Sequence, residues 1–416
     1  MTEKIKIFTI SDHPLSPSGV GTQTKYIIES MLKTGKYQFV SFGGAVKHNN
    51  QQPQKTEEWG LDWIIFPVDG YGDPDKVRNL IHQQKPDILW FMTDPRFYGW
   101  LWEMENEIRA HIPMIYYHVW DNYPYPKFNR TSYLSNDHIA CISKVTYDIV
   151  QTVAPEVASS YIPHAVDEEI FKPSNKQDIQ KYKSDRGLTN KFVCFWNNRN
   201  ARRKQSGTVI WWFKDFLDKV GHDKACLIMH TEVHDQHGQD LEAIIHELGL
   251  TDGQVLFSRN KVEPRDLAAV YNMADLTINI ADAEGFGLGT LESLSCGTPI
   301  LVNMTGGLQE QVTDGENWFG RGLQPASRAI IGSQQVPFIY EDRVNREDFL
   351  QALTELYEMG PEAREELGQL GRAWTQEKYN FGDFVQKWDD LFTETHNNCG
   401  SWESRENYTP YEVRVH

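Results

Sequence analysis

The sequence lacks several features that would place it in a special class of proteins. No run of about 18 apolar residues occurs, so no membrane-spanning helix is expected. The five cysteines are odd in number and show no paired spacing, which argues against a disulfide framework and predicts free thiols in a reducing compartment. The first residues show neither the long apolar segment nor the cleavage site of a signal peptide. We therefore expect a cytoplasmic protein.

Positive charge is also scarce. Lys and Arg number 41 against 58 Asp and Glu, which gives a formal net charge of -17. This balance excludes a uniformly basic surface for nucleic acid and a strong general attraction to anionic membranes. One short segment, residues 199–204, nevertheless concentrates basic side chains and predicts a local basic patch.

The length and the hydrophobic periodicity indicate the fold class. A chain of 416 residues favours two domains. Short apolar runs alternate with amphipathic segments, which is typical of βαβ units. The predicted strands are 5–10, 38–42, 63–66, 88–91, 114–117 and 138–142, then 193–196, 225–229, 255–257, 276–280 and 300–302. The pattern occurs twice, with a polar break around 172–186. We predict an α/β protein of two Rossmann-like, doubly wound domains, 1–172 and 187–378, followed at 379–416 by a helix that crosses back and a polar tail.

The most informative segment is AEGFGLGTLESLSCGTP at 283–299, which follows a predicted strand. Gly285, Gly287 and Gly289 let the backbone approach a ligand closely, and the N–H groups of the helix expected to begin here favour a phosphate. Glu284 and Glu292 flank this loop, and carboxylates in such a place are suited to accept hydrogen bonds from sugar hydroxyls. A bare glycine-rich turn is common in doubly wound folds, but the two glutamates favour a binding site.

This segment resembles the Glu-x7-Glu motif of glycosyltransferase family 4, retaining enzymes of the GT-B fold whose two Rossmann-like domains face a central cleft. The likeness extends to GTP at 297–299 and to GGLQE at 306–310. It implies that Glu284 contacts the donor sugar, that the intervening amides hold sugar and diphosphate, and that Glu292 binds the ribose. The donor-binding residues implied here are Glu284, Gly285, Phe286, Gly287, Leu288, Gly289 and Glu292.

A second segment, WNNRNARRK at 196–204, follows another predicted strand. Four basic residues at a strand end can neutralise a diphosphate, because Arg offers a bidentate fork and Lys a point charge. The family has an Arg followed five residues later by a Lys, and Arg199 and Lys204 share that spacing. The resemblance therefore implies a diphosphate clamp of Arg199 and Lys204, with Arg202 and Arg203 as weaker candidates. Taken alone, such a loop is more often a solvated surface.

Two further predictions concern the first domain. The loop SPSGVG at 16–21 follows the first predicted strand and resembles the family's glycine loop near the donor, with Gly19 and Gly21 as the candidates. Many members have adjacent glycines there, whereas this chain has Gly-Val-Gly. His118 follows the strand 114–117, at the edge where open α/β sheets bind ligands, and resembles a histidine that the family places near the donor sugar. The predicted catalytic residues are His118, Arg199, Lys204 and Glu284.

The acceptor site is predicted from position alone. Two polar residues after the strand 88–91 can reach the same edge of the sheet. The segment VWDNYPYPKF after His118 is unusually aromatic, and it either packs under a loop or forms a platform that stacks a sugar or base. The acceptor candidates are Asp94, Arg96, Trp120, Asp121 and Tyr123.

Two patterns invite a metal site, but other interpretations fit them better. Asp73-Pro-Asp75 matches the metal motif of the other large glycosyltransferase fold, yet it precedes a predicted helix, where Asp73 is suited to cap the first turn. His230, His234 and His237 carry no accompanying cysteine and occupy a predicted loop, so loop packing is favoured over zinc. No metal ligand is predicted.

The resemblance implies sugar transfer from a nucleoside-diphosphate sugar, UDP- or GDP-linked, with retained anomeric configuration and no required cofactor. The acceptor is a glycan, a lipid, a protein or a modified base in DNA. A transferase acting on hydroxymethylated DNA is one alternative, since an aromatic segment can hold a flipped base. A non-catalytic nucleotide-sugar-binding protein, an epimerase and a phosphorylase are the others.

Overall fold

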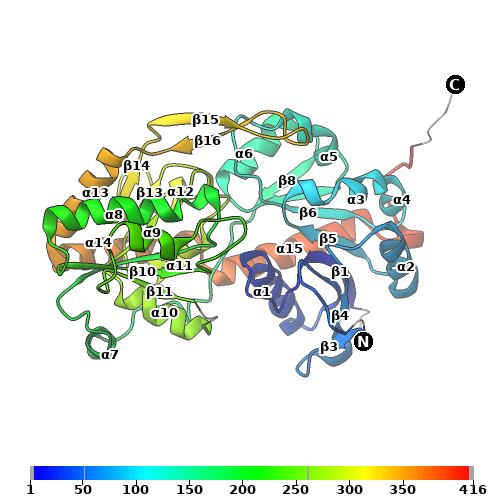
Figure 1. Ribbon diagram of the computed structural model, residues 1–416. Coiled ribbons are helices and arrows are strands. Elements are labelled where there is room, and N and C mark those ends of the chain that lie inside the picture. Colours follow the sequence, from blue (N-terminus) through cyan, green and yellow to red (C-terminus); the bar gives the residue numbers. More distant parts are fainter. Residues whose placement is uncertain (1–3, 51, 260–261, 412–416) are drawn as a thin grey trace. The chain divides into compact units, whose positions relative to one another are not determined.

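The computed structural model describes residues 4–50, 52–259 and 262–411. These residues form two compact units (Figure 1). Unit 1 comprises the described residues of Met1–Trp120, Tyr125–His164 and Gly382–His416, and unit 2 comprises Asp121–Pro124 and Ala165–Phe381. A short stretch from the first half of the sequence, Asp121–Pro124, therefore belongs to the second unit.

Unit 1 is built on an eight-stranded sheet with the strand order β3-β4-β2-β1-β5-β6-β7-β8. All neighbouring strands are parallel except β3 and β4. The strands are β1 (Ile5–Asp12), β2 (Tyr37–Gly44), β3 (Gln54–Lys55), β4 (Trp63–Pro67), β5 (Ile88–Met92), β6 (Met114–His118), β7 (His138–Cys141) and β8 (Ala158–Tyr161). The helices are α1 (Gly19–Lys33), α2 (Pro74–Gln84), α3 (Gly99–Glu103), α4 (Glu105–Arg109), α5 (Arg130–Leu134), α6 (Lys144–Val153) and α15 (Phe381–Cys399), with the short 3-10 helices η1 (Gly60–Asp62), η2 (Pro95–Phe97), η3 (Lys127–Asn129) and η5 (Trp402–Ser404). Strands β5 and β6 are buried at every residue, as expected for parallel strands covered on both faces.

Helix α15 packs against this sheet although it lies late in the sequence (Figure 1). Trp388 is fully buried, and its ring meets Trp90 of β5 edge-on at 5.9 Å and Tyr117 of β6 at 4.8 Å. The Tyr37 hydroxyl of β2 donates to Asp389 Oδ1 at 2.6 Å. The helix therefore supplies part of the core of unit 1.

The segment after α15 is fastened to unit 1 by a buried ion-pair cluster. Arg405 Nη2 donates to Asp137 Oδ1 at 2.7 Å, and Arg109 Nε donates to Asp137 Oδ2 at 3.0 Å. The side chains of Arg405 and Asp137 are 3% and 8% exposed. Asp137 also accepts a hydrogen bond from the backbone N–H of Met114. One carboxylate thus joins the tail, helix α4 and the start of β6.

Unit 2 is built on a six-stranded parallel sheet with the order β11-β10-β9-β12-β13-β14, and it carries a separate antiparallel hairpin, β15–β16. The strands are β9 (Phe192–Asn197), β10 (Ala225–His230), β11 (Val255–Ser258), β12 (Leu276–Asn279), β13 (Ile300–Asn303), β14 (Gly320–Leu323), β15 (Ser327–Ile331) and β16 (Ile339–Arg343). The helices are α7 (Lys176–Asp185), α8 (Ser206–Val220), α9 (Leu241–Glu247), α10 (Pro264–Met273), α11 (Leu288–Ser295), α12 (Leu308–Val312), α13 (Arg346–Glu358) and α14 (Gly360–Lys378), with the 3-10 helix η4 (Arg202–Lys204).

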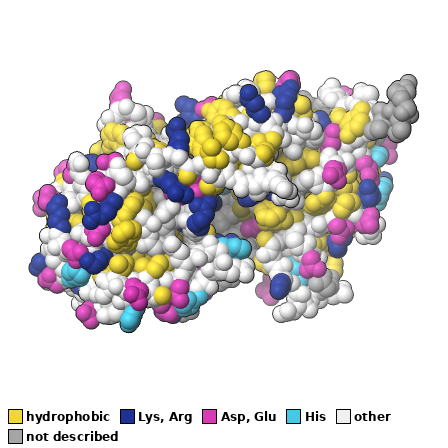
Figure 2. Space-filling model, turned by 45° about the horizontal axis from the view of Figure 1, so that its top comes forward, with side chains coloured by type: hydrophobic (Ala, Val, Ile, Leu, Met, Phe, Trp, Pro, Cys, Tyr) yellow, Lys and Arg dark blue, Asp and Glu magenta, His cyan; other side chains and the backbone are white. Residues whose placement is uncertain are grey.

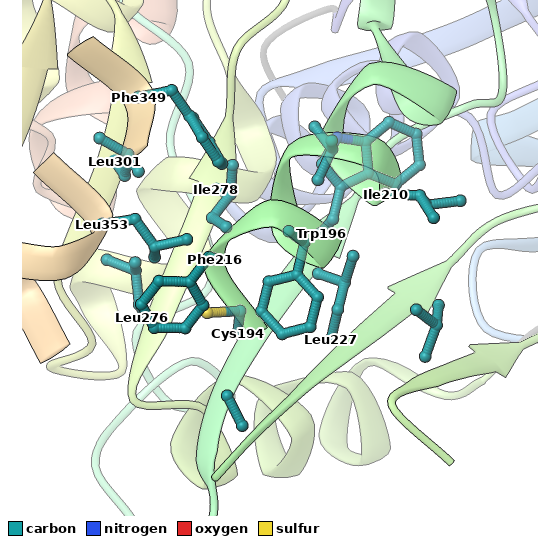
Figure 3. Close-up of a cluster of buried hydrophobic side chains, with 14 of the residues drawn as sticks. Cys194, Trp196, Ile210, Phe216, Leu227, Leu276, Ile278, Leu301, Phe349 and Leu353 are labelled. Carbon is teal, nitrogen blue, oxygen red and sulfur yellow. The ribbon is translucent and has the colours of Figure 1, made fainter. Parts of the chain in front are cut away.

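The core of unit 2 forms where the sheet meets helices α8 and α13. Figure 3 shows Trp196 and Leu276 of the central strands together with Phe216 of α8 and Phe349 of α13. All four side chains are 0% exposed. This packing fixes the central strands, from whose ends the candidate site loops depart.

The predicted α/β fold class is confirmed, and each predicted strand overlaps a strand of the structure. The strands that the sequence did not predict are β3, β8, β14, β15 and β16. Strands β8 (ASSY) and β15 (SRAII) are short runs with several polar residues, so their periodicity is weak. The predicted helix cap is confirmed, because Asp73 accepts a hydrogen bond from the Lys76 N–H at 2.9 Å.

Among the described residues, no helix is both long and apolar enough to cross a bilayer. On the face drawn in Figure 2, acidic and basic side chains are interspersed rather than separated. The excess of negative charge is therefore not gathered into one patch on that face.

We expect Asp137→Ala to lower the free energy of unfolding by about 3–5 kcal/mol, because removing one partner of a buried ion pair leaves the other charges unpaired. Arg405 would lose its carboxylate partner, and Arg109 would keep only Glu105. Urea denaturation followed by tryptophan fluorescence measures the change.

The control is Asp75→Ala, which removes a carboxylate whose side chain is 87% exposed and paired with Arg78. Exposed ion pairs contribute little, so this variant should unfold close to the wild type. Equal losses in the two variants would contradict the role given to the buried cluster.

Candidate active site

The glycine loop of unit 2 lies between β12 and α11. Gly287 caps α11 with φ +94°, a backbone conformation that favours glycine, and a Cβ there would overlap the side chains of Leu308 and Thr290. The Thr290 hydroxyl donates to the Gly287 carbonyl at 2.8 Å, and Gln311 Nε2 donates to the Phe286 carbonyl at 2.7 Å. The loop is therefore held in place, with the first N–H groups of α11 at its end.

The glycine pair at 306–307 supports this loop from beneath. A Cβ on Gly306 would overlap the Glu284 carbonyl, and Gly307 donates its N–H to the same carbonyl at 3.0 Å. A Cβ on Gly307 would meet Phe286. A larger residue at 306 would displace the Glu284 backbone, and one at 307 would displace the backbone of Gly285 and Phe286.

Lys204 and Glu284 form a buried ion pair between two loops that are 80 residues apart in the sequence. Their side chains are 10% and 13% exposed. Lys204 ends η4 after β9, and Glu284 follows β12, the strand next to β9 in the sheet. The structure thus brings together two of the predicted catalytic residues.

Charge and burial oppose each other in this pair. Burial alone would raise the pKa of Glu284, but the positive charges of Lys204 and Arg203 outweigh it and leave that pKa below its ordinary value. Burial and the charge of Arg203 lower the pKa of Lys204, while the carboxylates of Glu284 and Asp121 act against that change.

The other basic side chains of this loop have different carboxylate partners in unit 2. Arg199, which is 61% exposed, forms two hydrogen bonds with Asp235, at 2.6 and 3.1 Å. Arg202 forms two with Glu341 of β16, at 2.8 and 2.7 Å. Arg203 donates to the carbonyl of Ala283 and lies 3.5 Å from Asp121. Arg203 and Lys204 therefore contact the glutamate loop, whereas Arg199 contacts the loop after β10.

Glu292 lies on α11 and accepts a hydrogen bond from the Tyr271 hydroxyl at 2.8 Å. Asn197 at the end of β9 donates to the same hydroxyl at 2.8 Å. Burial raises the pKa of Glu292 to about 7, and the hydrogen bond from Tyr271 acts in the opposite direction. This carboxyl therefore changes charge near neutral pH.

In unit 1, the glycine loop begins helix α1. Ser18 caps the helix by accepting from the Gly21 N–H at 3.0 Å, and its hydroxyl donates to Asp12 Oδ2 at 2.6 Å. A Cβ on Gly21 would approach the His13 carbonyl and the Ser16 side chain. Gly19 is the first residue of α1.

His118 is the last residue of β6 and is completely buried. Its Nε2 lies 2.7 Å from the Tyr133 hydroxyl, and its Nδ1 has no hydrogen-bond partner in the described part of the chain. Burial lowers the pKa of His118 to about 3, so the ring is neutral at physiological pH.

The acceptor candidates are distributed over both units. Asp94 and Arg96 bond to each other, with Arg96 Nε donating to Asp94 Oδ1 at 2.9 Å. Trp120 is buried and packs edge-on against Phe128. Asp121 and Tyr123 belong to unit 2, where Tyr123 stacks on Tyr340 of the hairpin at 6.2 Å. Asp94, Arg96 and Trp120 thus lie in unit 1, and Asp121 and Tyr123 lie in unit 2.

The histidines of the 230–237 loop are separately engaged. His230 bonds Ser258, His234 bonds Glu242 and His237 bonds Gln236. Within residues 4–50, 52–259 and 262–411, no group of three or more His, Cys, Asp or Glu side chains is arranged to hold a metal ion.

Three residues that hold the site residues in place were not identified from the sequence, namely Asp282, Tyr271 and Glu341. Asp282 is 2% exposed, and burial raises its pKa to about 6; it accepts a hydrogen bond from Gln205 at 2.7 Å. Tyr271, which positions Glu292, lies in an amphipathic helix and looks like a core residue. Glu341 belongs to a hairpin that the pattern did not predict. The one available signal for Asp282 was its place directly before the segment AEGF.

The sequence matches known proteins mainly in unit 2. Residues 176–374, just under half of the chain, match the family model described as Glycosyl transferases group 1. The D-inositol 3-phosphate glycosyltransferase of Paenarthrobacter aurescens (strain TC1) is 30% identical over 109 residues, which cover 26% of each chain. That of Acidothermus cellulolyticus is 40% identical over 77 residues, which cover 18% of this chain and 17% of the relative. The chain thus aligns with about a quarter or less of the length of these relatives.

Solved structures resemble the chain over nearly its whole length. Sucrose-phosphate synthase from Thermosynechococcus elongatus has a TM-score of 0.74 at 16% identity and covers 95% of this chain and 100% of its own. Anabaena Alr3699/HepE, in complex with UDP and glucose, has a TM-score of 0.69 at 15% identity, covering 94% and 100%. At such low identity these likenesses establish the fold alone.

The family match agrees with the glycosyltransferase class that the resemblance implied, and the solved structures agree with the implied fold. Residues 176–374 therefore match the model of Glycosyl transferases group 1, and the chain as a whole has the GT-B fold.

Proposed function

We propose that this protein is a retaining glycosyltransferase that uses a nucleoside-diphosphate sugar, with UDP favoured over GDP as the nucleotide. The observation that carries the proposal is the buried pair of Lys204 and Glu284 at the loop leading into α11. It places a cation and a carboxylate beside the N–H groups at the start of α11. A cation and N–H groups bind a diphosphate, and a carboxylate accepts hydrogen bonds from sugar hydroxyls. The UDP complexes of Alr3699/HepE support the choice of nucleotide.

In this proposal the nucleotide and the sugar are held by different groups. The N–H groups at the start of α11 and the Lys204 ammonium bind the diphosphate, and Arg203 or Arg199 adds a second cation. Glu284 accepts hydrogen bonds from sugar hydroxyls, and Glu292 accepts them from the ribose. The basic loop supplies enough positive charge for the diphosphate, so we propose that a divalent metal is not required.

The proposed reaction replaces one bond at the anomeric carbon with another on the same face. The bond from this carbon to the phosphate oxygen breaks, and a bond to the acceptor oxygen forms. The acceptor's proton passes to the departing phosphate oxygen. Lys204 and the α11 amides stabilise the negative charge that develops on the leaving diphosphate, the kind of electrostatic contribution that usually dominates in such sites.

The relatives suggest where to look for the acceptor. The D-inositol 3-phosphate glycosyltransferases are named for inositol phosphate, and the structurally similar sucrose-phosphate synthase for sucrose phosphate. We therefore propose a sugar or polyol, free or phosphorylated, ahead of lipid, protein or modified DNA. Nucleotide release from UDP- and GDP-sugars should be measured with each acceptor class, and the anomer of the product determined by NMR. Donor binding without release for any acceptor would instead indicate a binding protein, and an inverted product would contradict retention.

Ligand-induced stabilisation identifies the donor nucleotide. We expect UDP or GDP at about 100 times its Kd to add about 2.7 kcal/mol of stability to the wild type, with or without EDTA. Glu292→Ala should weaken the binding of that nucleotide about 10- to 100-fold, because a hydrogen bond to a charged group contributes about 1.5–3 kcal/mol. Thermal shift titrations measure both effects.

Glu247→Ala is the matched control for this experiment, because Glu247 is exposed on α9. It should bind the nucleotide as the wild type does. If neither UDP nor GDP stabilises the wild type, the proposed function is wrong.

The pKa of Glu292 predicts how donor binding depends on pH. This pKa is raised to about 7, so the carboxylate that accepts ribose hydroxyls is present above pH 7 and is lost as the pH falls. We expect the Kd for UDP-glucose to rise about tenfold from pH 8 to pH 6 if only the ionised form binds. Isothermal titration calorimetry at several pH values measures this dependence.

UDP-glucose suits this measurement because its diphosphate diester does not titrate in this range. The variant Glu292→Gln should bind more weakly at pH 8 and show a flat profile. An unchanged slope in Glu292→Gln would assign the pH dependence to another group.

A further inference from the structure

The segment Asp121–Pro124 is held in unit 2 by an isolated antiparallel bridge between Tyr123 and Tyr340 of β16. Tyr340 of β16 donates its N–H to the Tyr123 carbonyl at 2.7 Å, and their rings stack with an interplanar angle of 16°. Asn122 Nδ2 donates to the Tyr340 carbonyl at 3.4 Å. These contacts begin one residue after Asp121, so the hairpin fixes the place of the Asp121 carboxylate.

The base of the hairpin is bonded to both loops of the candidate site. Glu341, which is 1% exposed, receives two hydrogen bonds from Arg202 of the basic loop. Asp342 donates its N–H to the Asp282 carbonyl, two residues before Glu284, at 3.0 Å. The segment that carries Asp121 is therefore connected through β16 to the parts of unit 2 that would bind the donor.

Each basic side chain in the 199–204 loop faces a carboxylate. The pairs are Arg199–Asp235, Arg202–Glu341, Arg203–Asp121 and Lys204–Glu284. Each positive charge of this loop thus has at least one carboxylate partner. A diphosphate can gain the attraction of this loop only by weakening at least one of these pairs.

The pair of Arg203 and Asp121 is the one best suited to open. Its atoms are 3.5 Å apart, whereas Arg199 and Arg202 each bond their partner twice at 2.6–3.1 Å. The side chains of Arg203 and Asp121 are 39% and 19% exposed. Arg203 also donates to the Ala283 carbonyl, which keeps its guanidinium beside the glutamate loop.

We propose that Asp121 is a positioning residue that serves as an internal counter-ion for the donor site, an inference that rests on the function proposed above. Before the donor binds, its carboxylate holds Arg203 beside Lys204 and offsets the repulsion between these two cations. The donor diphosphate then takes over Arg203 and replaces Asp121 as its partner. Asp121 therefore lowers the affinity for the donor, and in exchange it keeps the basic loop ordered for binding.

The test compares the binding of UDP and of inorganic pyrophosphate to the wild type and to Asp121→Asn by calorimetry at low salt. We expect Asp121→Asn to bind both probes about three- to fivefold more tightly, since a partly exposed ion pair contributes up to about 1 kcal/mol. The gain should shrink in high salt, where such interactions are screened. Asp121→Glu should restore wild-type affinity, and Asp218→Asn, which removes one exposed carboxylate of α8, should bind as the wild type does.

A double-mutant cycle identifies the partner of Asp121. Arg203→Gln should weaken pyrophosphate binding, and adding Asp121→Asn to Arg203→Gln should give no further gain. If the wild type binds UDP but Asp121→Asn binds it equally or more weakly, the counter-ion role is wrong while the proposed function stands. If Asp121→Asn does not fold, weak pyrophosphate binding by Arg203→Gln supports the role and unchanged binding overturns it. If the wild type binds neither UDP, GDP nor pyrophosphate, both proposals fail.

Discussion

The rest of the candidate site depends on the buried ion pair of Lys204 and Glu284. Moving either charge from water into the protein costs several kcal/mol unless a partner compensates it, so each of the two loops requires the other. The surrounding features follow from this requirement. The glycines at 306 and 307 leave room for the backbone of the glutamate loop. Gln205 and the Asp342 N–H donate hydrogen bonds to Asp282, which fixes the chain two residues before Glu284. A site that depends on two unlike charges must be rigid, because a small displacement would leave both unpaired.

The sheet topology explains why these distant segments meet. In unit 2, β9 pairs with β12 and β12 with β13, all in parallel, so their carboxyl ends lie along one edge. The basic loop, the glutamate loop and the glycine pair each follow one of these strands. Ligand sites of open α/β sheets form at this edge. The candidate site is thus formed by three loops, and the hydrophobic core that packs against the sheet determines the distances between these loops.

The sequence predicted these parts to different degrees. Strands β5, β6 and β9 are continuous apolar runs, which is the pattern expected of parallel strands buried on both faces. These strands could therefore be predicted from the local sequence. The glutamate loop was predictable because glycines and carboxylates at that spacing are unusual. The acidic partner of each basic residue was not predictable, because ion pairs such as Arg202–Glu341 join positions 139 apart and have no local pattern. The aromatic segment around Asp121 made it an acceptor candidate, whereas its ion pair with Arg203, 82 positions away, left no local signal.

The docking of α15 and of the tail on unit 1 has a consequence for the order in which the chain folds during synthesis. Unit 2 has all of its sequence once Phe381 has been made. In unit 1, Tyr37 of β2, Trp90 of β5 and Asp137 before β7 contact residues that are made later, namely Asp389, Trp388 and Arg405. The strands translated first are therefore completed last. Domains usually fold as units in their order of synthesis, from the N-terminus onward. In this protein the second unit can finish while the first is still exposed on the ribosome.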